Sequence, residues 1–263
     1  MAPDNWVRSL GLDTDGTLFV DIDNGIRLYD HCINAHLPTP VNIHPGDLMK
    51  PANRQLYYQF LTTLKEIDGI IYHSLYDGGH QFRKGDIVVD AGARIGTFTA
   101  KISAAVGNEG KVIAIEPEPG NFACLKKNIE ANRLSNVVAI QKMLWSQTVR
   151  LALYLSGNAA AHSAYLDEFY SPTGDSISVE AESLDDILSK LGIESVNLVK
   201  MDVEGSEIEA LGGMNRTLKS DVELAIAAYH PVMGRLTHSV IIPRLEQLGF
   251  KTTYVEGLVQ AHR

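Results

Sequence analysis

The stretch that decides the fold is Ile87-Val88-Val89-Asp90-Ala91-Gly92-Ala93-Arg94-Ile95-Gly96, which is followed twenty residues later by Glu116. Its apolar run predicts a buried strand, and the glycines after it predict a tight turn into a helix. The residues before Glu116 predict a second buried strand that ends at this acid. Such an order builds a nucleotide-type pocket at the carboxyl edge of a parallel sheet, where open α/β folds bind their ligands.

The composition of the turn distinguishes between ligands. A dinucleotide-binding turn has the pattern G-x-G-x-x-G, whose middle glycine lets backbone amides approach a pyrophosphate. Here Arg94 stands at that middle position, between Gly92 and Gly96. The pattern therefore disfavours an NAD-dependent oxidoreductase.

Bulk composition excludes several classes of protein. The chain has 263 residues, of which 45% are hydrophobic and 21% charged, and this composition predicts a globular protein with a sizeable core. The net charge of −9 and the lack of a Lys/Arg-rich run argue against a nucleic-acid partner. No apolar run approaches the roughly 18 residues that cross a membrane, and no secretory signal is visible. We expect a soluble, cytoplasmic protein without a zinc or dithiol site, since no Cys-x-x-Cys is present.

Strands and helices alternate after residue 80, which is typical of an α/β protein with a doubly wound, mostly parallel sheet. The expected strands are 86–90, 111–115, 137–140, 196–201, 222–228, 250–255 and 258–261. Two more short strands, 149–155 and 177–182, interrupt the alternation, and helices are expected to begin after Ser183 and near residue 238.

Residues 1–80 are expected to form an N-terminal extension of the domain that residues 81–263 make. Residues 18–28 predict a β-hairpin with a two-residue type I′ turn at Asn24-Gly25, the preferred pair for that turn. An irregular connection is expected over 31–51, and apolar residues at helical spacing predict a helix over 53–67.

Several segments, in this order, resemble the FkbM-type methyltransferases, which depend on S-adenosylmethionine. The matching segments are Lys84 to Gly96, Glu116 to Pro119, Leu125 to Asn128, and the most specific one, Lys200-Met201-Asp202-Val203-Glu204-Gly205-Ser206-Glu207. The resemblance implies the class I methyltransferase fold, a Rossmann-like, seven-stranded sheet, with S-adenosylmethionine as cofactor. It also implies O-methylation of a hydroxyl on a sugar, a polyketide or another secondary metabolite. Arg94 departs from the family, which more often has Asn there.

The cofactor is expected to bind along the strand ends. Glu116 is expected to accept hydrogen bonds from the ribose hydroxyls, and Trp145 with Ser146 to flank the adenine ring, although a tryptophan in the core is an equal alternative. The expected cofactor-binding residues are Asp90, Gly92, Ala93, Arg94, Gly96, Glu116, Pro117, Trp145, Ser146 and Asp202.

Catalysis is expected at Asp202, Glu204 and His230, because two strands of the same sheet edge end there. His230 is expected to take the acceptor proton, since a histidine titrates near neutral pH, while Asp202 orients the hydroxyl or the cofactor. The alternative for the acids is a structural one: Ser206 caps the following helix and the acids complement its dipole. The three residues are also able to bind a hard divalent cation, but two acids two positions apart are too common to assign a metal.

The sequence therefore predicts an S-adenosylmethionine-dependent O-methyltransferase whose partner is a small-molecule hydroxyl acceptor, with residues 1–80 as a cap on the acceptor site. An RNA methyltransferase and a non-catalytic adenosine-binding module are the alternatives. The acceptor, the methylated atom, metal dependence and the oligomeric state, including a homo-oligomer, stay open.

Overall fold

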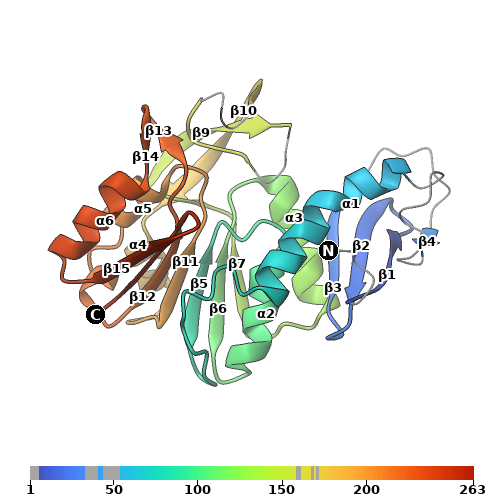
Figure 1. Ribbon diagram of the computed structural model, residues 1–263, viewed down its shortest axis with the longest axis horizontal. Coiled ribbons are helices and arrows are strands. Elements are labelled where there is room, and N and C mark those ends of the chain that lie inside the picture. Colours follow the sequence, from blue (N-terminus) through green and yellow to red (C-terminus); the bar gives the residue numbers. More distant parts are fainter. Residues whose placement is uncertain (1–5, 33–40, 44–53, 158–160, 167–168, 170–171) are drawn as a thin grey trace.

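A mostly parallel sheet of seven strands forms the centre of the computed structural model, which describes residues 6–32, 41–43, 54–157, 161–166, 169 and 172–263 (Figure 1). Its strand order is β15-β16-β12-β11-β5-β6-β7. Of these seven strands, β16 alone runs in the opposite direction to the others. The strands are β5 Ile87–Ala91, β6 Lys111–Ile115, β7 Val137–Ile140, β11 Leu198–Met201, β12 Glu223–Ala227, β15 Lys251–Val255 and β16 Leu258–His262. This arrangement confirms the predicted doubly wound sheet of seven strands.

Helices cover both faces of this sheet, which explains why its central strands are mostly apolar, with the buried pair of Asp90 and Lys200 as the exception. One face packs against α2 and α3, and the other against α4, α5 and α6. The helices are α2 Thr97–Val106, α3 Pro119–Ala131, α4 Leu184–Lys190, α5 Glu207–Gly212 and α6 His238–Gln247, with a 3₁₀ turn at Thr217–Lys219. Ser183 caps α4 as expected, because its side chain accepts a hydrogen bond from the Asp186 amide. None of the helices in the described part of the chain is long and apolar enough to cross a membrane.

The N-terminal extension is larger than the predicted hairpin and helix. It is an antiparallel sheet of order β3-β2-β1-β4, covered by helix α1. Its elements are β1 Val7–Leu12, β2 Thr17–Ile22, β3 Arg27–Cys32, β4 Val41–Ile43 and α1 Arg54–Ile67, followed by a π-helical turn Asp68–Tyr72. The predicted hairpin and helix are both present, whereas β1 and β4 were not predicted. The irregular connection expected over 31–51 was wrong at 41–43, which pair with β1 as β4, and most of the rest of it lies outside the described residues.

The hairpin turn differs from its prediction. The Ile22 amide donates to the Ile26 carbonyl (3.0 Å), so the turn has the three residues from Asp23 to Gly25. A type I′ turn requires a positive φ at both central residues. Gly25 has a φ of +89°, but Asn24 is not among the residues with positive φ. The Asn24 side chain instead accepts a hydrogen bond from the Ile26 amide (3.1 Å). The prediction of a two-residue type I′ turn was therefore wrong, because this side-chain bond favours a longer turn.

Two small β structures stand beside the carboxyl edge of the central sheet, at the top of Figure 1. One is a sheet of order β8-β10-β9, with β8 Met143–Leu144, β9 Val149–Ser156 and β10 Pro172–Glu182. The other is the hairpin of β13 Pro231–Val232 and β14 Arg235–Leu236. The predicted strands 149–155 and 177–182 are confirmed, and β10 begins earlier than expected.

Helix α3 attaches the extension to the central sheet through Asn128, which is buried. Its amide oxygen accepts from the Tyr29 backbone N–H (2.6 Å), and its amide nitrogen donates to the carbonyls of Tyr29 (2.8 Å) and Ile95 (2.7 Å). A side chain on the helix thus satisfies the edge of β3, as a neighbouring strand would.

Arg94 makes a second link between the extension and the central sheet. Its guanidinium lies 3.1 Å from the Asp30 carboxylate of β3 and also pairs with Glu66 of α1. All three side chains are largely buried, with exposed fractions of 13%, 7% and 17%. Although burial alone raises the pKa of Asp30, the hydrogen bonds from His31 and the charge of Arg94 hold it below its usual range. Arg94 is therefore the counter-ion that two buried carboxylates of the extension require.

Replacing Arg94→Met should lower the free energy of unfolding by about 3–5 kcal/mol, because it leaves two buried carboxylates without a counter-ion. Urea denaturation measures this change. The matched control is Arg150→Met, which breaks an exposed pair with Glu180 and should cost at most about 1 kcal/mol. Equal costs for the two variants would contradict the role assigned to Arg94.

Candidate functional site

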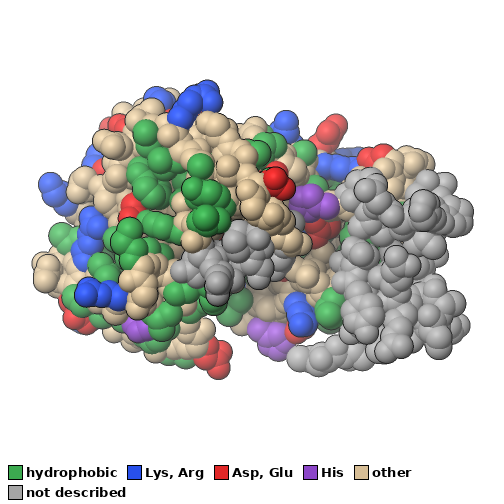
Figure 2. All heavy atoms as spheres, turned by 90° about the horizontal axis from the view of Figure 1, so that it is seen from above, with side chains coloured by type: hydrophobic (Ala, Val, Ile, Leu, Met, Phe, Trp, Pro, Cys, Tyr) green, Lys and Arg blue, Asp and Glu red, His purple; other side chains and the backbone are tan. Residues whose placement is uncertain are grey.

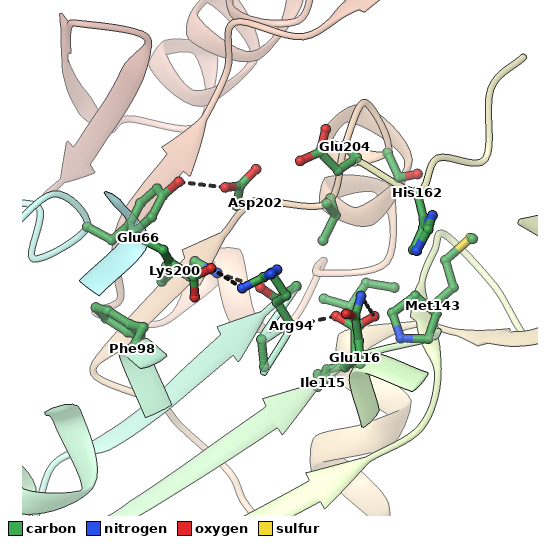
Figure 3. Close-up of a pocket in the computed structure, with 18 of the residues that line it drawn as sticks. Glu66, Arg94, Phe98, Ile115, Glu116, Met143, His162, Lys200, Asp202 and Glu204 are labelled. Carbon is green, nitrogen blue, oxygen red and sulfur yellow. Dashed lines mark hydrogen bonds and ion pairs between the residues drawn. The ribbon is translucent and has the colours of Figure 1, made fainter. Parts of the chain in front are cut away.

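A cavity of about 260 Å³ opens at the carboxyl edge of the central sheet. Its walls come from the turn after β5, from the residues that follow β6 and β11, and from the extension (Figure 3). The position is the one that the sequence predicts for the ligand of this sheet.

Gly92 brings the turn after β5 against the end of β11. Its φ is +73°, and a Cβ built on it would lie only 1.7 Å from the Asp202 carbonyl oxygen. No other residue fits this position without moving one of the two strands. Gly96 has a different role: it begins α2 with a φ of +91°, and a Cβ there would meet the Leu125 side chain at 2.6 Å.

Glu116 presents a carboxylate to the cavity from the end of β6. The amides of Arg94 (2.9 Å) and Glu118 (3.0 Å) donate to its two oxygens, so the side chain is fixed. Burial raises the pKa of Glu116 to about 7. Beside it lies an apolar wall to which Ile115, Met143, Leu144 and Leu153 contribute.

Asp90 lies beneath the turn and does not line the cavity. It is fully buried, its Oδ1 pairs with Lys200 Nζ (3.0 Å), and its Oδ2 accepts from the Thr99 hydroxyl (2.6 Å). Lys200 in turn donates to the Gly92 carbonyl (2.7 Å) and lines the cavity itself. Asp90 thus holds the turn through Lys200.

Three candidate catalytic residues converge next to this cavity, because β11 and β12 are parallel neighbours. His230 Nε2 lies 3.3 Å from Glu204 Oε2 and 3.7 Å from Asp202 Oδ1. On its other side, His230 Nδ1 lies 2.9 Å from Oε1 of Glu207, which is fully buried. Asp202 and Glu204 line the cavity, whereas the His230 side chain has no exposed surface.

The backbone at Glu204 is held in an unusual conformation. Glu204 has a φ of +52° and Gly205 one of +96°. Glu207 stabilises this loop, because its carboxylate accepts from the amides of Val203 and Gly205 (3.2 Å each). Strain of this kind in a non-glycine residue is found mostly at functional sites. Ser206 stands at the N-cap position, directly before α5, but its side chain makes no capping hydrogen bond. The structural alternative therefore lacks the cap that it assumes.

Ionisation of the cluster follows from its burial and its charges. Burial lowers the pKa of His230, but hydrogen bonds to Glu204 and Glu207 outweigh this effect and raise that pKa to about 11. Burial raises the pKa of Glu204 to about 7. The His230 side chain has no exposed surface and does not line the cavity, so its role as proton acceptor stays a prediction.

The structure brings some of the expected site residues to the cavity and not others. Those that line it are Gly92, Ala93, Arg94, Glu116, Pro117, Asp202 and Glu204. Those that are not among the lining residues are Asp90, Gly96, Trp145, Ser146 and His230. Trp145 packs on the sheet of β8, β9 and β10, where its amide donates to the Glu182 carbonyl (3.0 Å).

Several residues of the site were missed from the sequence. Tyr76 donates from its hydroxyl to Asp202 Oδ2 (2.5 Å), and Glu66 lines the cavity from α1 (Figure 3). No local pattern marks either residue, because both come from the extension. Lys200 and Glu207 lie within the most specific motif, and membership of that motif was a signal of function. Residue spacing alone did not assign either of them a role.

Comparisons with known proteins agree with this geometry. A model of the methyltransferase FkbM domain matches residues 90–252. The chain is 27% identical over 193 residues to the 31-O-demethyl-FK506 methyltransferase FkbM of Streptomyces tacrolimicus, covering 63% of this chain and 74% of that protein. It is 29% identical over 145 residues to the hexuronic acid methyltransferase AglP of Haloferax volcanii, covering 55% and 56%.

A solved structure shares the fold. It is the methyltransferase FkbM of Methylobacillus flagellatus, with a TM-score of 0.51 and 19% identity, over 70% of this chain and 45% of that one. The match over residues 90–252 contains the glycine turn, Glu116 and the Asp202–Glu207 motif, and the chain therefore belongs to the FkbM family of S-adenosylmethionine-dependent methyltransferases.

Proposed function

We propose that this enzyme transfers a methyl group from S-adenosylmethionine to a hydroxyl oxygen of a small molecule. The observation that carries the proposal is one cavity with carboxylates at two separate places, Glu116 toward one end and Asp202 with Glu204 toward the other (Figure 3). The name of one relative, a 2-O-methyltransferase of Sinorhizobium fredii, also supports transfer to oxygen.

The residues near Glu116 suit the adenosine part of the cofactor. A fixed carboxylate is a good acceptor for two ribose hydroxyls, and the apolar wall of Ile115, Met143 and Leu144 suits a flat adenine ring. When bound, S-adenosylmethionine supplies the methyl group from its sulfonium.

Asp202 and Glu204 are the groups proposed to contact the acceptor, because both line the cavity. Their carboxylates hold the hydroxyl so that its oxygen points at the methyl group, and such positioning supplies much of the rate. As the oxygen gains the methyl group it loses its proton, which the Glu204 carboxylate accepts. His230 is buried behind them and acts through Glu204, so we propose it as a positioning residue.

The extension is proposed as the cap of the acceptor site. It contributes Thr62, Glu66, Ile70, Leu75 and Tyr76 to the cavity wall. Tyr76 also fixes Asp202 through its hydrogen bond to Oδ2. The extension therefore both encloses the acceptor and orients one of the residues that contact it.

An RNA acceptor is less well supported. The net charge is −9, and binding to a phosphate backbone needs gathered cations. Figure 2 shows the Lys and Arg side chains of the described residues scattered over one face and not gathered into a strip. A small acceptor also agrees with the enclosed position of Asp202 and Glu204.

Calorimetry should show binding of S-adenosylmethionine and S-adenosylhomocysteine but not of NAD, since the turn lacks a pyrophosphate cradle. Glu116→Ala should weaken binding of S-adenosylhomocysteine by about 1.5–3 kcal/mol, the range for a hydrogen bond to a charged group. Glu130→Ala is the control, because this exposed acid of α3 does not line the cavity. Binding of NAD alone, or equal effects of the two variants, would refute the proposed cofactor site.

Turnover is tested by incubating the enzyme with S-adenosylmethionine and hydroxyl-bearing small molecules, and by searching for products that gain one methyl group by mass spectrometry. Glu204→Gln should lower kcat by about 10²–10⁴-fold, as for loss of a general base, with little change in S-adenosylhomocysteine affinity. Glu209→Gln, whose side chain does not line the cavity, is the control. A larger loss of kcat in His230→Gln than in Glu204→Gln would indicate that His230, and not Glu204, is the general base.

The role of the extension as a cap is tested with an acceptor that this search for methylated products identifies. Leu75→Ala should raise KM for the acceptor, because Leu75 lines the cavity from the extension, and should leave S-adenosylhomocysteine affinity unchanged. Leu166→Ala removes an exposed leucine that does not line the cavity, and serves as control. An unchanged KM in Leu75→Ala would exclude this residue from the acceptor site.

A further inference from the structure

We infer that Asp202, Glu204 and His230 hold a divalent cation, Mg²⁺ or Mn²⁺, at the inner wall of the cavity. One ligand atom from each residue lies within 4.8 Å of the other two. The three atoms are two carboxylate oxygens and an imidazole nitrogen, brought together from the ends of β11 and β12. This inference rests on the proposed function for its chemistry, but binding of the ion can be measured without it.

The distances between the ligand atoms suit an ion with short bonds. Mg²⁺ binds its ligands at about 2.0–2.1 Å, so two ligands at right angles lie roughly 3 Å apart. His230 Nε2 is 3.3 Å from Glu204 Oε2 and 3.7 Å from Asp202 Oδ1. All three atoms lie within 4.8 Å of one another, so the two acids would move closer to each other and to His230 when the ion binds.

Each of two ligands is oriented by a further residue, as is usual in metal sites. Tyr76 donates to Asp202 Oδ2 (2.5 Å), which leaves Oδ1 toward His230. That Oδ1 atom is buried and accepts no hydrogen bond from any described residue. Glu207 Oε1 lies 2.9 Å from His230 Nδ1, which leaves Nε2 toward the two acids. The carboxylate–histidine arrangement is the one that fixes an imidazole for metal binding.

The charge balance of the cluster also favours a cation. Three carboxylates, those of Asp202, Glu204 and Glu207, surround one imidazole. The nearby ammonium of Lys200 is held by Asp90 at 3.0 Å, and the guanidinium of Arg94 by Asp30 and Glu66. A buried excess of negative charge is costly unless an opposite charge joins it.

The ligand set and its position indicate the kind of ion and its role. Two carboxylates and one imidazole, without a thiolate, suit a hard or borderline divalent ion. Three protein ligands leave open positions that face the cavity, since Asp202 and Glu204 both line it. An acceptor hydroxyl bound there would become more acidic, which makes transfer of its proton to a carboxylate easier.

The test uses the full chain, from which bound metal is first removed with EDTA and the EDTA is then removed by dialysis. Mn²⁺ is titrated alone and followed by electron paramagnetic resonance, with Mg²⁺ as competitor. We expect one Mn²⁺ per chain, and at least about tenfold weaker binding in Asp202→Asn, Glu204→Gln and His230→Gln. Glu207→Gln should weaken binding about 10–100-fold, as for a residue that orients a ligand. Glu116→Gln is the matched control, because it removes a carboxylate from another part of the same cavity and should leave Mn²⁺ affinity unchanged.

Each outcome separates the cation site from the proposed function. No Mn²⁺ binding at millimolar concentration, or equal binding in Asp202→Asn and in the native chain, would overturn the cation site. If His230→Gln fails to fold by thermal melting, Asp202→Asn and Glu204→Gln decide the question. Methyl transfer by EDTA-treated protein that binds no Mn²⁺ would overturn the cation site and leave the function standing. Stoichiometric Mn²⁺ binding without methyl transfer to any hydroxyl would support the site and count against the function.

Discussion

The contact between Gly92 and the Asp202 carbonyl is the constraint on which the site depends. It follows from the parallel pairing of β5 with β11, which sets the ends of these two strands side by side. Because a Cβ at Gly92 would lie 1.7 Å from that carbonyl, the turn and the Asp202–Glu207 loop can only approach in this way with glycine. The sides of the cavity that we propose for the cofactor and for the acceptor are therefore positioned by one backbone contact, and Lys200 strengthens it by bonding to the Gly92 carbonyl.

Charge pairing attaches the extension to this centre. Arg94 stands in the turn itself, with a φ of +50°, and its guanidinium reaches Asp30 and Glu66 of the extension. The Arg94 amide meanwhile donates to Glu116. One residue thus joins the cap, the turn and the carboxylate proposed to bind ribose, so a shift of the extension would be felt at the cofactor site. For this reason, the effect of a substitution in the extension is best judged by measuring both the affinity for the cofactor and the KM for the acceptor.

The sequence predicted the parts of the fold that depend on local patterns. Apolar runs such as Ile87-Val88-Val89 identified the central strands, and strand ends identified Glu116, Asp202 and His230 as neighbours at one edge. Contacts between distant segments carry no such pattern: Tyr76 and Asp202 are 126 positions apart, and Asp30 and Arg94 are 64 apart. Trp145 was expected at the cavity because it follows the third strand, but the pairing of β8 with β10 takes it onto another sheet.

The Asp202–Glu207 motif illustrates why residue type alone did not assign roles. Glu207 was noted only as the last residue of this motif and was given no role, yet it closes the loop through two backbone amides and holds His230 by its Nδ1 atom. That contact directs Nε2 toward Asp202 and Glu204, and burial keeps the imidazole from reaching an acceptor directly. A histidine at a strand end suggests a general base by its ordinary pKa. Between carboxylates and out of solvent, the same side chain is the one that we propose to orient Glu204 and to share a cation with it.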